Sequence, residues 1–444
     1  MFLSASETRQ ISARLLDKSR VDSCVVSIRG DHRTNLRFAQ NIPTTNGSIS
    51  ELSVTIESHL DGRSGSVTVT SLEDDVLAQA VVRSETIARL LPANPELMPP
   101  LGQQTYQPGA GYDGPTATVP AVALAKAAGE VTRLAVDRAV EVTGYGVVGH
   151  GFNTIATSAG LFAYDRHTGA RFTVTARNSK GTWSGWSGKS ETRFDRLDTA
   201  RLGKRAIDKA AHDVVPLDLD PGKYTVILEP SAVADLVWWV LRMMDARSAE
   251  EGRSFLSRKG GGTRLGEALF DEKVTVYSDP NDPIAPEPVF GEDGLPQRRT
   301  VWIDGGIVRN LVRSRFWAKK TGREPVARPR SFVMAGGSAS IDQMIRDTRR
   351  GILVTRVWYT NLVDPRSLLL TGLTRDGNFF IENGHIVAPA HNLRFNESAI
   401  ELLSNVAAVG PSERTCVGVD DSSAISVPPL LVKEFTFSSR SSGI

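Results

Sequence analysis

The chain has 444 residues, which is enough for two or three domains with cores of their own. Its composition, 40% hydrophobic and 23% charged, is that of an ordinary globular protein, and a net charge of +2 argues against bulk attraction to nucleic acid. Two cysteines, Cys24 and Cys416, argue against a disulfide framework. The sequence also shows neither a signal peptide nor an apolar run of the roughly 20 residues that span a bilayer. We therefore expect a soluble cytoplasmic protein with no membrane contact.

Residues 1–215 are predicted to form an N-terminal α+β domain with two similar halves. The first half has strands with period-2 alternation between two helices, with turns at Asn46-Gly47 and Asp61-Gly62. Its predicted elements are a helix at 5–16, strands at 23–28, 35–39, 50–57 and 64–70, and a helix from 71 to about 91. A Pro-rich linker, residues 92–115, follows.

The second half repeats this order. Its predicted elements are a helix at 119–140, strands at 144–150, 154–158, 160–165 and 171–177, a Gly/Ser/Trp loop at 181–188 and a helix at 195–212. The repeat indicates an internal duplication, and two unrelated αβ units on one sheet are the alternative. Because Trp183 and Trp186 stand in the predicted loop, we expect them at a subunit contact rather than in a local core.

Residues 216–444 are predicted to form a C-terminal, β-rich domain. A strand at 224–228 passes directly into a helix at Glu229-Pro230, where apolar residues begin to recur with helical spacing. Further strands are predicted at 273–277, 300–303, 307–312, 332–335, 351–360, 368–375, 378–382, 385–387 and 429–437. Hairpin turns at Asp304-Gly305-Gly306, Asp376-Gly377 and Asn383-Gly384 indicate an antiparallel sheet that closes towards a barrel.

Several segments of this domain occur in an order that resembles a known family. They are Ser254 to Gly266 (SFLSRKGGGTRLG), Gly305 to Leu311 (GGIVRNL), Asn378 to Ile386 (NFFIENGHI), Asn392 to Ser398 (NLRFNES) and Val427 to Val432 (VPPLLV). This order resembles the TldD/PmbA family, also described as modulators of DNA gyrase. The resemblance covers nearly the whole chain and is strongest after about residue 200.

The resemblance implies a zinc peptidase in one branch and a metal-free subunit in the other. TldD-type members carry HExxxH at the strand-to-helix junction, and use it with a later Cys to hold zinc for peptide hydrolysis. In this chain the three motif positions are Glu229, Pro230 and Ala234. The resemblance therefore implies a PmbA/TldE-type subunit with no catalytic residue and no metal of its own. Zinc would come from a TldD-type partner, and the substrates would be unfolded or precursor peptides.

Five residues are candidates for lining a peptide groove. Glu229 and Asp235 lie on the first turns of the predicted helix, where a helix dipole alone would also explain Glu229. Gly260, Gly261 and Gly262 match neither nucleotide-binding glycine pattern, and the resemblance implies a mobile arm beside the cleft.

Two other functions stay open at this level. A self-sufficient peptidase could use Cys416 with His385 or His391, or hold a metal on the same three residues, provided that they meet in space. A peptide-binding or regulatory homodimer without a protease partner is the other.

Overall fold

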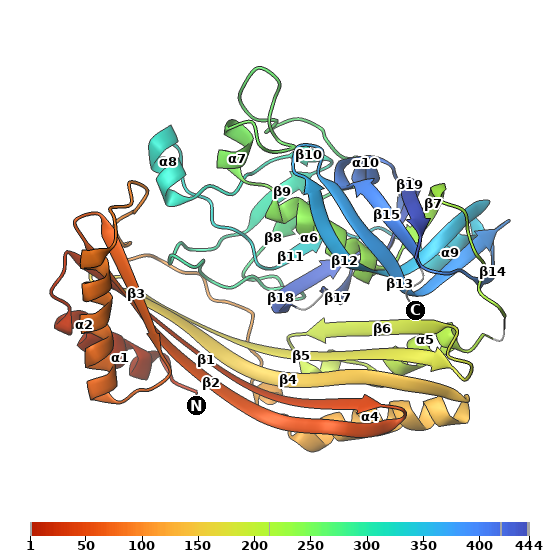
Figure 1. Ribbon diagram of the computed structural model, residues 1–444, viewed down its shortest axis with the longest axis horizontal. Coiled ribbons are helices and arrows are strands. Elements are labelled where there is room, and N and C mark those ends of the chain that lie inside the picture. Colours follow the sequence, from red (N-terminus) through yellow and green to blue (C-terminus); the bar gives the residue numbers. More distant parts are fainter. Residues whose placement is uncertain (1, 213, 418–419, 442–444) are drawn as a thin grey trace.

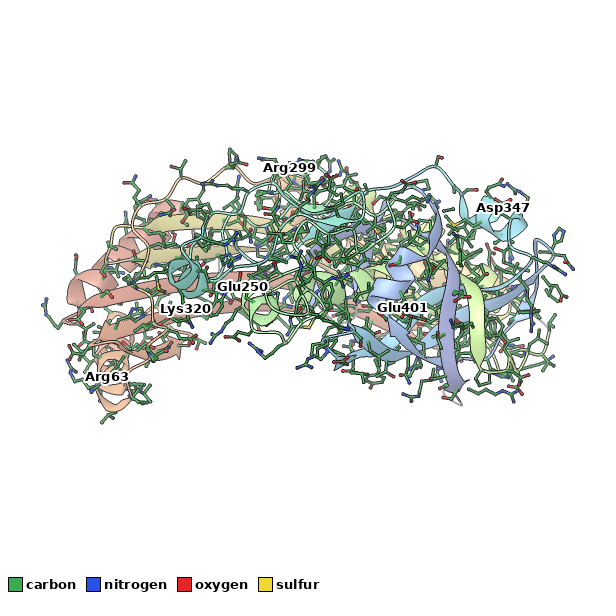
Figure 2. The ribbon with its side chains drawn as sticks, turned by 90° about the horizontal axis from the view of Figure 1, so that it is seen from above. Arg63, Glu250, Arg299, Lys320, Asp347 and Glu401 are labelled. Atoms are coloured by element: carbon green, nitrogen blue, oxygen red, sulfur yellow. The ribbon has the colours of Figure 1, made fainter. Side chains whose placement is uncertain are left out.

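The computed structural model describes residues 2–212, 214–417 and 420–441. Figure 1 shows a long curved sheet below and to the left, and a more compact β-rich part above its right-hand end. Seen from above in Figure 2, Arg63 and Asp347 lie towards opposite ends of the long axis. The mixed α+β class predicted from the sequence is confirmed.

One antiparallel sheet of six strands, in the order β3-β2-β1-β4-β5-β6, organises the N-terminal part. Its strands are β1 Ser23–Ala39, β2 Ile42–Leu60, β3 Arg63–Val69, β4 Val140–Thr157, β5 Phe162–Asn178 and β6 Ser184–Glu191. Its helices are α1 Ala5–Lys18, α2 Asp74–Leu90, α3 Gly114–Ala117, α4 Ala121–Asp137 and α5 Thr199–Ala210, with a 3-10 turn at Phe194–Arg196. Each half has its own apolar cluster between its strands and its helices.

The predicted repeat is visible in the topology. Both halves run helix, three strands, helix, and the two first strands, β1 and β4, are antiparallel neighbours at the centre of the sheet. His32 and His150, 118 residues apart, face each other there with ring centroids 5.3 Å apart. A shift of about 118 residues carries each element of the first half close to its counterpart in the second. The two halves are therefore related by an approximate two-fold axis near these histidines.

A glycine lets the last helix of each half approach its third strand closely. A Cβ built on Gly65 of β3 would lie 2.3 Å from the Ser84 carbonyl oxygen of α2. A Cβ on Gly185 of β6 would lie 2.5 Å from the Ala206 carbonyl oxygen of α5. The two halves thus share a packing detail that a larger side chain would break.

Three sequence predictions in this part are wrong. Asn46-Gly47 is not a turn, because β2 continues through both residues paired to β1. The predicted loop at 181–188 is mostly strand β6. Trp183 and Trp186 are only 5% and 6% exposed, and the Trp183 indole N–H donates to the Lys209 carbonyl at 2.7 Å. Both indoles are therefore buried within this chain and are not an exposed subunit contact.

The C-terminal part contains two further sheets. Its strands are β7 Gly222–Leu228, β8 Val276–Ser278, β9 Thr300–Asp304, β10 Ile307–Val308, β11 Phe332–Met334, β12 Arg350–Asp364, β13 Leu369–Glu382, β14 His385–Pro389, β15 Leu393–Ser398, β16 Val406–Val409, β17 Glu413–Val417, β18 Asp420–Val427 and β19 Leu430–Arg440. Its helices are α6 Pro230–Arg242, α7 Ala246–Glu250, α8 Arg315–Thr321, α9 Ile341–Arg346 and α10 Ala399–Ser404.

The predicted barrel-like closure is confirmed. Strands β12, β7, β19, β15 and β13 pair in a ring, because β13 also pairs with β12. The second sheet has the order β10-β9-β8-β11-β18-β17. The expectation of wholly antiparallel sheets needs correction, since β7 pairs with β12, and β11 with β18, in parallel. The apolar side of α6 belongs to the largest core cluster, together with residues of both sheets.

Two predicted hairpin turns in this part are confirmed, and one is not. Gly305-Gly306 and Asn383-Gly384 connect paired strands with positive φ. Asp376-Gly377 instead forms a bulge inside β13, where the register with β12 shifts. The bulge directs Asp376 towards the N-terminal part, where its carboxylate accepts from the Ser184 hydroxyl at 2.8 Å. Within the described residues, no helix is long and apolar enough to cross a membrane.

Replacing Gly65 or Gly185 with alanine should lower the free energy of unfolding by about 1–3 kcal/mol, because each added methyl group would press on a helix backbone. Urea denaturation followed by circular dichroism measures the change. Gly169→Ala is the matched control, since a Cβ there meets no atom within 4 Å. Equal stability of all three variants would show that the close approach imposes no constraint.

Candidate functional site at the start of helix α6

The strand-to-helix junction predicted at Glu229-Pro230 is present. Strand β7 ends at Leu228, Glu229 is the N-cap of α6, and Pro230 occupies the first turn, where its missing N–H is not needed. The Glu229 N–H donates to the Val354 carbonyl of β12 at 3.0 Å, so the start of α6 is fixed to the barrel. The expected apolar stripe from Val233 to Met244 is buried.

The Glu229 carboxylate is ion-paired with two cations of the N-terminal part. It lies 2.8 Å from Lys209 Nζ and 2.9 Å from an Arg205 guanidinium nitrogen, both on α5. Glu229 is 6% exposed, so the pair is shielded from solvent. The sequence identified Glu229 but neither partner, because helical periodicity gives no sign that α5 of one part turns its cations towards the other part.

Lys209 has three polar partners in this cluster, and its side chain is only 11% exposed. Its ammonium also donates to the Thr355 hydroxyl at 2.8 Å and to the Trp186 carbonyl at 3.3 Å. Burial lowers the pKa of Lys209 to about 8, while the Glu229 carboxylate opposes that shift. The same carboxylate raises the pKa of Arg205. The charged state of Lys209 therefore depends on Glu229.

Further polar contacts join the two parts around this ion pair. On one side, the Ser231 and Thr415 hydroxyls are 2.7 Å apart, so the start of α6 contacts β17. On the other, the Ser190 hydroxyl of β6 donates to the Thr415 carbonyl at 2.8 Å. Arg414 Nε donates to the Ser190 carbonyl at 3.0 Å, and burial lowers the pKa of Arg414 to about 10. The start of α6 is thus enclosed by a polar contact between the two parts.

The residues at this junction do not fit a zinc ion. Of the three positions that match HExxxH, Pro230 and Ala234 have no side-chain ligand atom. The Glu229 carboxylate is already paired with Lys209 and Arg205, so a divalent cation there would meet two positive charges at close range. The local electrostatics favour an ion pair at the place where the resemblance implies a metal in the catalytic branch.

The alternative trio lies on different elements. His385 is on β14 of the barrel sheet and is exposed. His391 lies between β14 and β15, and its backbone N–H donates to the Leu217 carbonyl. Cys416 is buried on β17 in the other sheet, beside Thr415. Across the described ranges, no group of three His, Cys, Asp or Glu residues could hold a metal. The structure therefore offers no metal site on His385, His391 and Cys416.

The remaining groove candidates are more exposed to solvent than Glu229. Asp235 is half-buried on α6. Gly260, Gly261 and Gly262 are exposed, all with positive φ, in a turn closed by the Arg258 N–H donating to the Gly262 carbonyl at 3.0 Å. No atom lies within 4 Å of a Cβ built on any of the three. Their role in a peptide groove stays a prediction.

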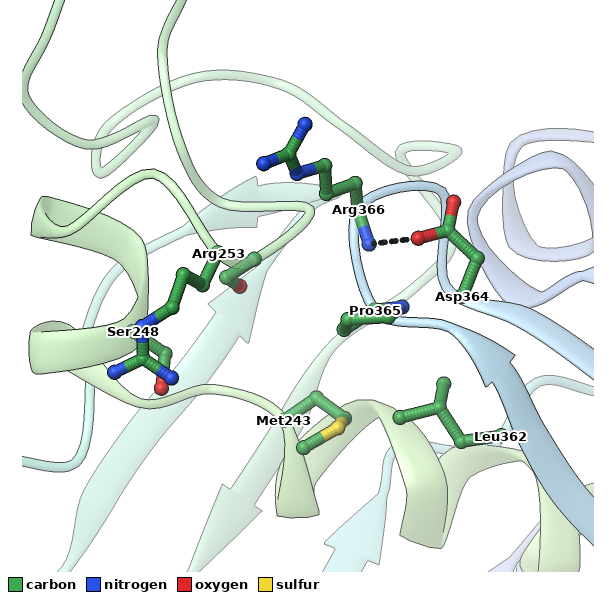
Figure 3. Close-up of a pocket in the computed structure, with 8 residues that line it drawn as sticks. Met243, Ser248, Arg253, Leu362, Asp364, Pro365 and Arg366 are labelled. Carbon is green, nitrogen blue, oxygen red and sulfur yellow. Dashed lines mark hydrogen bonds between the residues drawn. The ribbon is translucent and has the colours of Figure 1, made fainter.

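A pocket that the sequence did not indicate lies at the opposite end of α6 (Figure 3). It has a volume of about 470 Å³ and lies between the end of α6, α7 and the β12–β13 turn. Its lining residues are Met243, Ser248, Arg253, Ser254, Leu362, Asp364, Pro365 and Arg366. The lining does not include Glu229 or its partners, so this pocket is separate from the ion-paired junction.

Glu229→Gln should lower the free energy of unfolding by about 3–5 kcal/mol, because the enclosed Lys209 would lose its counter-charge and the partly exposed Arg205 would lose one of its two carboxylate partners. Urea denaturation of both variants measures the effect. Glu413→Gln is the control, since Glu413 pairs with the same Arg205 at 3.5 Å but its side chain is 45% exposed. The control should lose about 0–1 kcal/mol. Similar losses in both variants would contradict a special role for the buried pair.

The loss in free energy of unfolding caused by Glu229→Gln should become smaller as pH rises towards about 8. Without the carboxylate, the pKa of Lys209 falls below about 8 in the folded chain, whereas the unfolded value of 10.5 is unchanged. The folded variant therefore releases its proton at a lower pH than the folded parent, and gains stability relative to the parent over that interval. Denaturation from about pH 6 to about pH 9 tests this. If the difference in free energy of unfolding between parent and variant does not change with pH, Lys209 does not titrate in this pH range.

Comparisons with known proteins give the same family as the motif order. Residues 118–212 match the PmbA/TldA metallopeptidase central domain, and residues 221–439 match the C-terminal domain of the same family. A metalloprotease of Methanothermobacter thermautotrophicus is 26% identical over 248 residues, which are 53% of this chain and 53% of that protein. A metalloprotease of Archaeoglobus fulgidus is 24% identical over 156 residues, or 32% of this chain and 36% of that protein. The chain thus matches about half of the first relative's length, and less of the second's.

Two solved structures have a similar fold along nearly the whole chain. TldE from Thermococcus kodakarensis has a TM-score of 0.84 at 18% identity, with 98% of this chain and 100% of that chain covered. A protein of Thermotoga maritima described as a modulator of DNA gyrase has a TM-score of 0.83 at 18% identity, with 97% and 100% covered. At this identity the likeness shows the fold alone. Together with the two family matches, it establishes that the chain belongs to the PmbA/TldD family.

Proposed function

We propose that this chain is the non-catalytic, PmbA/TldE-type subunit of a two-subunit metalloprotease. A TldD-type partner supplies the HExxxH motif and the zinc, and the heterodimer degrades unfolded peptides or processes peptide precursors. This chain supplies part of the enclosure around the substrate and no group that acts on the scissile bond.

The observation that carries the proposal is the ion pair at the start of α6. Peptide hydrolysis by a zinc enzyme needs imidazole ligands that leave one position for water, and a carboxylate free to take its proton. In this chain the one carboxylate at the junction is bound by Lys209 and Arg205, and the other two positions are Pro230 and Ala234. These residues stabilise a contact between two domains and offer water no activating group.

Neither alternative function has an observation in its favour. A self-sufficient metallopeptidase on Cys416, His385 and His391 is disfavoured because no group of three His, Cys, Asp or Glu residues within the described ranges could hold a metal. Cys416 and His385 also lie in two different sheets. A peptide-binding or regulatory homodimer needs no catalytic group and is an outcome that the experiment below distinguishes.

We place the complex in the cytoplasm, with no nucleic acid or membrane as partner. Cys24 and Cys416 are both buried and neither is part of a disulfide within the described residues, which suits a reducing compartment. Burial raises the pKa of the Cys24 thiol to about 11, so it is a structural rather than a reactive cysteine.

The test measures zinc content and peptide hydrolysis for the purified chain, for its nearest HExxxH homologue, and for their mixture. We expect zinc in the homologue and in the mixture but not in this chain, and hydrolysis in the mixture only, because the two subunits together enclose the substrate. Size-exclusion chromatography with light scattering should show a mixed complex.

The outcomes separate the three functions. Stoichiometric zinc and hydrolysis by this chain alone would establish a self-sufficient enzyme. A stable homodimer that ignores the homologue would support the regulatory function. The control is the homologue with both motif histidines replaced by alanine, which should still bind this chain but yield no hydrolysis.

A further inference from the structure

Strand β2 has a long edge that no other strand covers. Its last residues, Val54 to Leu60, pair with β3, but the stretch from Ile42 to Ser53 pairs only with β1. Nearly all of this stretch is exposed, including Ile42 at 60% and Ile49 at 51%. Within the described residues, no backbone hydrogen bond links it to any element other than β1. We call this stretch, residues 42–53, the open edge of β2.

The two-fold relation between the halves assigns this edge a counterpart on β5. There, β6 pairs with the stretch from Ala170 to Arg177, and leaves the earlier stretch from Phe162 to Gly169 without a strand on the side away from β4. In both three-stranded halves of the sheet, the outer strand thus pairs with only the second half of the middle strand, β2 or β5. The two edges are equivalent in the fold and differ only in what lies beside them.

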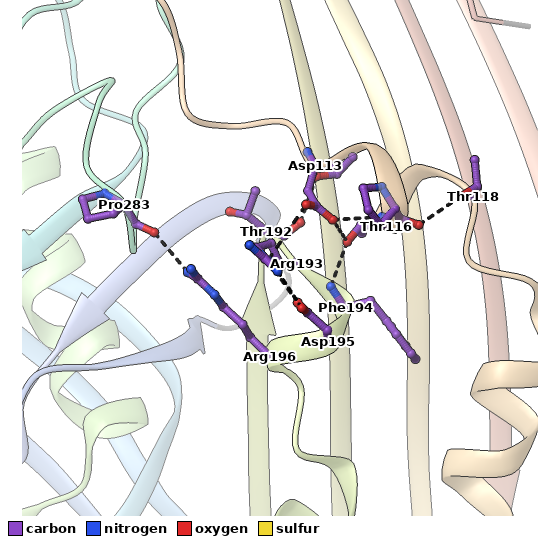
Figure 4. Close-up of polar contacts among 11 residues, drawn as sticks. Asp113, Thr116, Thr118, Thr192, Arg193, Phe194, Asp195, Arg196 and Pro283 are labelled. Atoms are coloured by element: carbon purple, nitrogen blue, oxygen red, sulfur yellow. Dashed lines mark hydrogen bonds and ion pairs between the residues drawn. The ribbon is translucent and has the colours of Figure 1, made fainter.

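The chain itself covers the edge on β5. The Thr168 N–H donates to the Gly111 carbonyl at 2.9 Å, the Asp113 N–H donates to the Thr168 hydroxyl at 3.0 Å, and Gly102 forms a bridge with Gly160. Figure 4 shows Asp113 at the end of this segment, and Thr116 of the following helix α3, lying against Thr192 to Phe194. The covering segment, from about 101 to 113, is an extended stretch of the Pro-rich linker with no helix or paired strand.

The equivalent position on the open edge is Ser50. Thr168 lies opposite His150 across β4, and Ser50 lies opposite His32 across β1. Since the Thr168 N–H points away from the sheet to reach Gly111, the Ser50 N–H has the same outward direction by the two-fold relation. The edge therefore presents the Ser50 N–H to solvent, at the position where its counterpart on β5 donates the Thr168 N–H to the linker.

The composition of the open edge favours an extended peptide over a folded subunit. After Pro43 at its start, the stretch holds one charged residue, Glu51, which is paired with Arg33 at 2.7 Å, and no lysine of the kind that usually protects an edge strand. Its exposed side chains are mostly Ser, Thr and Asn, which do not form the apolar centre of a stable subunit interface. Backbone pairing would dominate binding, and such pairing tolerates many sequences.

We propose that the open edge of β2 binds an extended segment of unfolded polypeptide as an additional antiparallel strand. The peptide takes the place that residues 101–113 of the linker take on β5. The inference rests on the proposed function only in naming unfolded peptide as the ligand, because the edge itself is a property of this chain. It also locates the binding more than 170 residues before the junction at Glu229 in sequence, on a different sheet.

The experiment uses the full chain alone, without partner or zinc, so that its result is independent of the protease assembly. The probe is a fluorescent peptide of about twelve residues, rich in Thr and Val, which matches the open edge in length. Fluorescence anisotropy measures binding, and hydrogen–deuterium exchange locates it. We expect slower exchange in residues 42–53 on adding the peptide, and no binding of the same peptide N-methylated at alternate residues.

Two substitutions at one position separate backbone pairing from side-chain contact. Ser50→Pro removes the outward N–H, and should weaken binding by about tenfold or more. Ser50→Ala keeps the N–H and should bind like the parent. Circular dichroism checks that both variants fold. If Ser50→Pro does not fold, the N-methylated peptide still tests whether backbone pairing is needed for binding.

Each other result overturns the inference. Equal binding by Ser50→Pro and Ser50→Ala, or protection elsewhere in the chain, would exclude backbone pairing at this edge. Slower exchange of residues 42–53 on adding the HExxxH homologue without peptide would show that the edge is a subunit contact. None of these results changes the zinc and hydrolysis measurements, so the proposed function can survive the failure of this inference.

Discussion

The placement of the two parts of this protein depends on one buried ion pair. Lys209 ends a helix of the first part, Glu229 begins a helix of the second, and neither carries an exposed side chain. Removing two charges from water is costly, and that cost is offset only if they meet with good geometry. The pair therefore stabilises the one relative orientation of the two parts in which the charges meet, and in other orientations the buried charges would be unpaired. The hydrogen bonds from Ser184 to Asp376 and from Ser190 to the Thr415 carbonyl also join the two parts and favour the same orientation.

The same pair explains why the fold can persist without a metal at the junction. A strand that passes directly into a helix exposes unpaired N–H groups and a helix dipole, which favour a negative group at that place. Glu229 provides the negative charge, and Lys209 and Arg205 balance it from the other part. An electrostatic contact between domains thus occupies the position where the family resemblance implies a metal in catalytic members. This contact supports the non-catalytic role that we propose for the chain.

The sequence predicted local features better than contacts between distant segments. Period-2 alternation located the strands, and glycines located the turns at Gly305-Gly306 and Asn383-Gly384, because these signals depend on neighbouring residues only. Long strands were divided wherever polar or glycine residues interrupted the alternation, as at Asn46-Gly47, which β2 crosses within an exposed arm. The partners of Glu229 could not be predicted, since nothing in the α5 sequence says which domain its cations face. The burial of Trp183 and Trp186 was missed for the same reason.

The duplication gives the two halves of the N-terminal sheet the same fold and different surroundings. The second half is committed to the rest of the chain: α5 provides Lys209 and Arg205, β6 provides Ser184 and Ser190, and the linker covers the edge of β5. The corresponding surfaces of the first half have no such neighbours among the described residues, and α2 ends in the exposed Leu90 where α5 ends near the buried Lys209. The contact surfaces of the second half are therefore buried against the rest of the chain, whereas the equivalent surfaces of the first half stay open to binding. The edge of β2 is the clearest of these, because the linker lies beside its counterpart on β5 and accepts a hydrogen bond from the Thr168 N–H there.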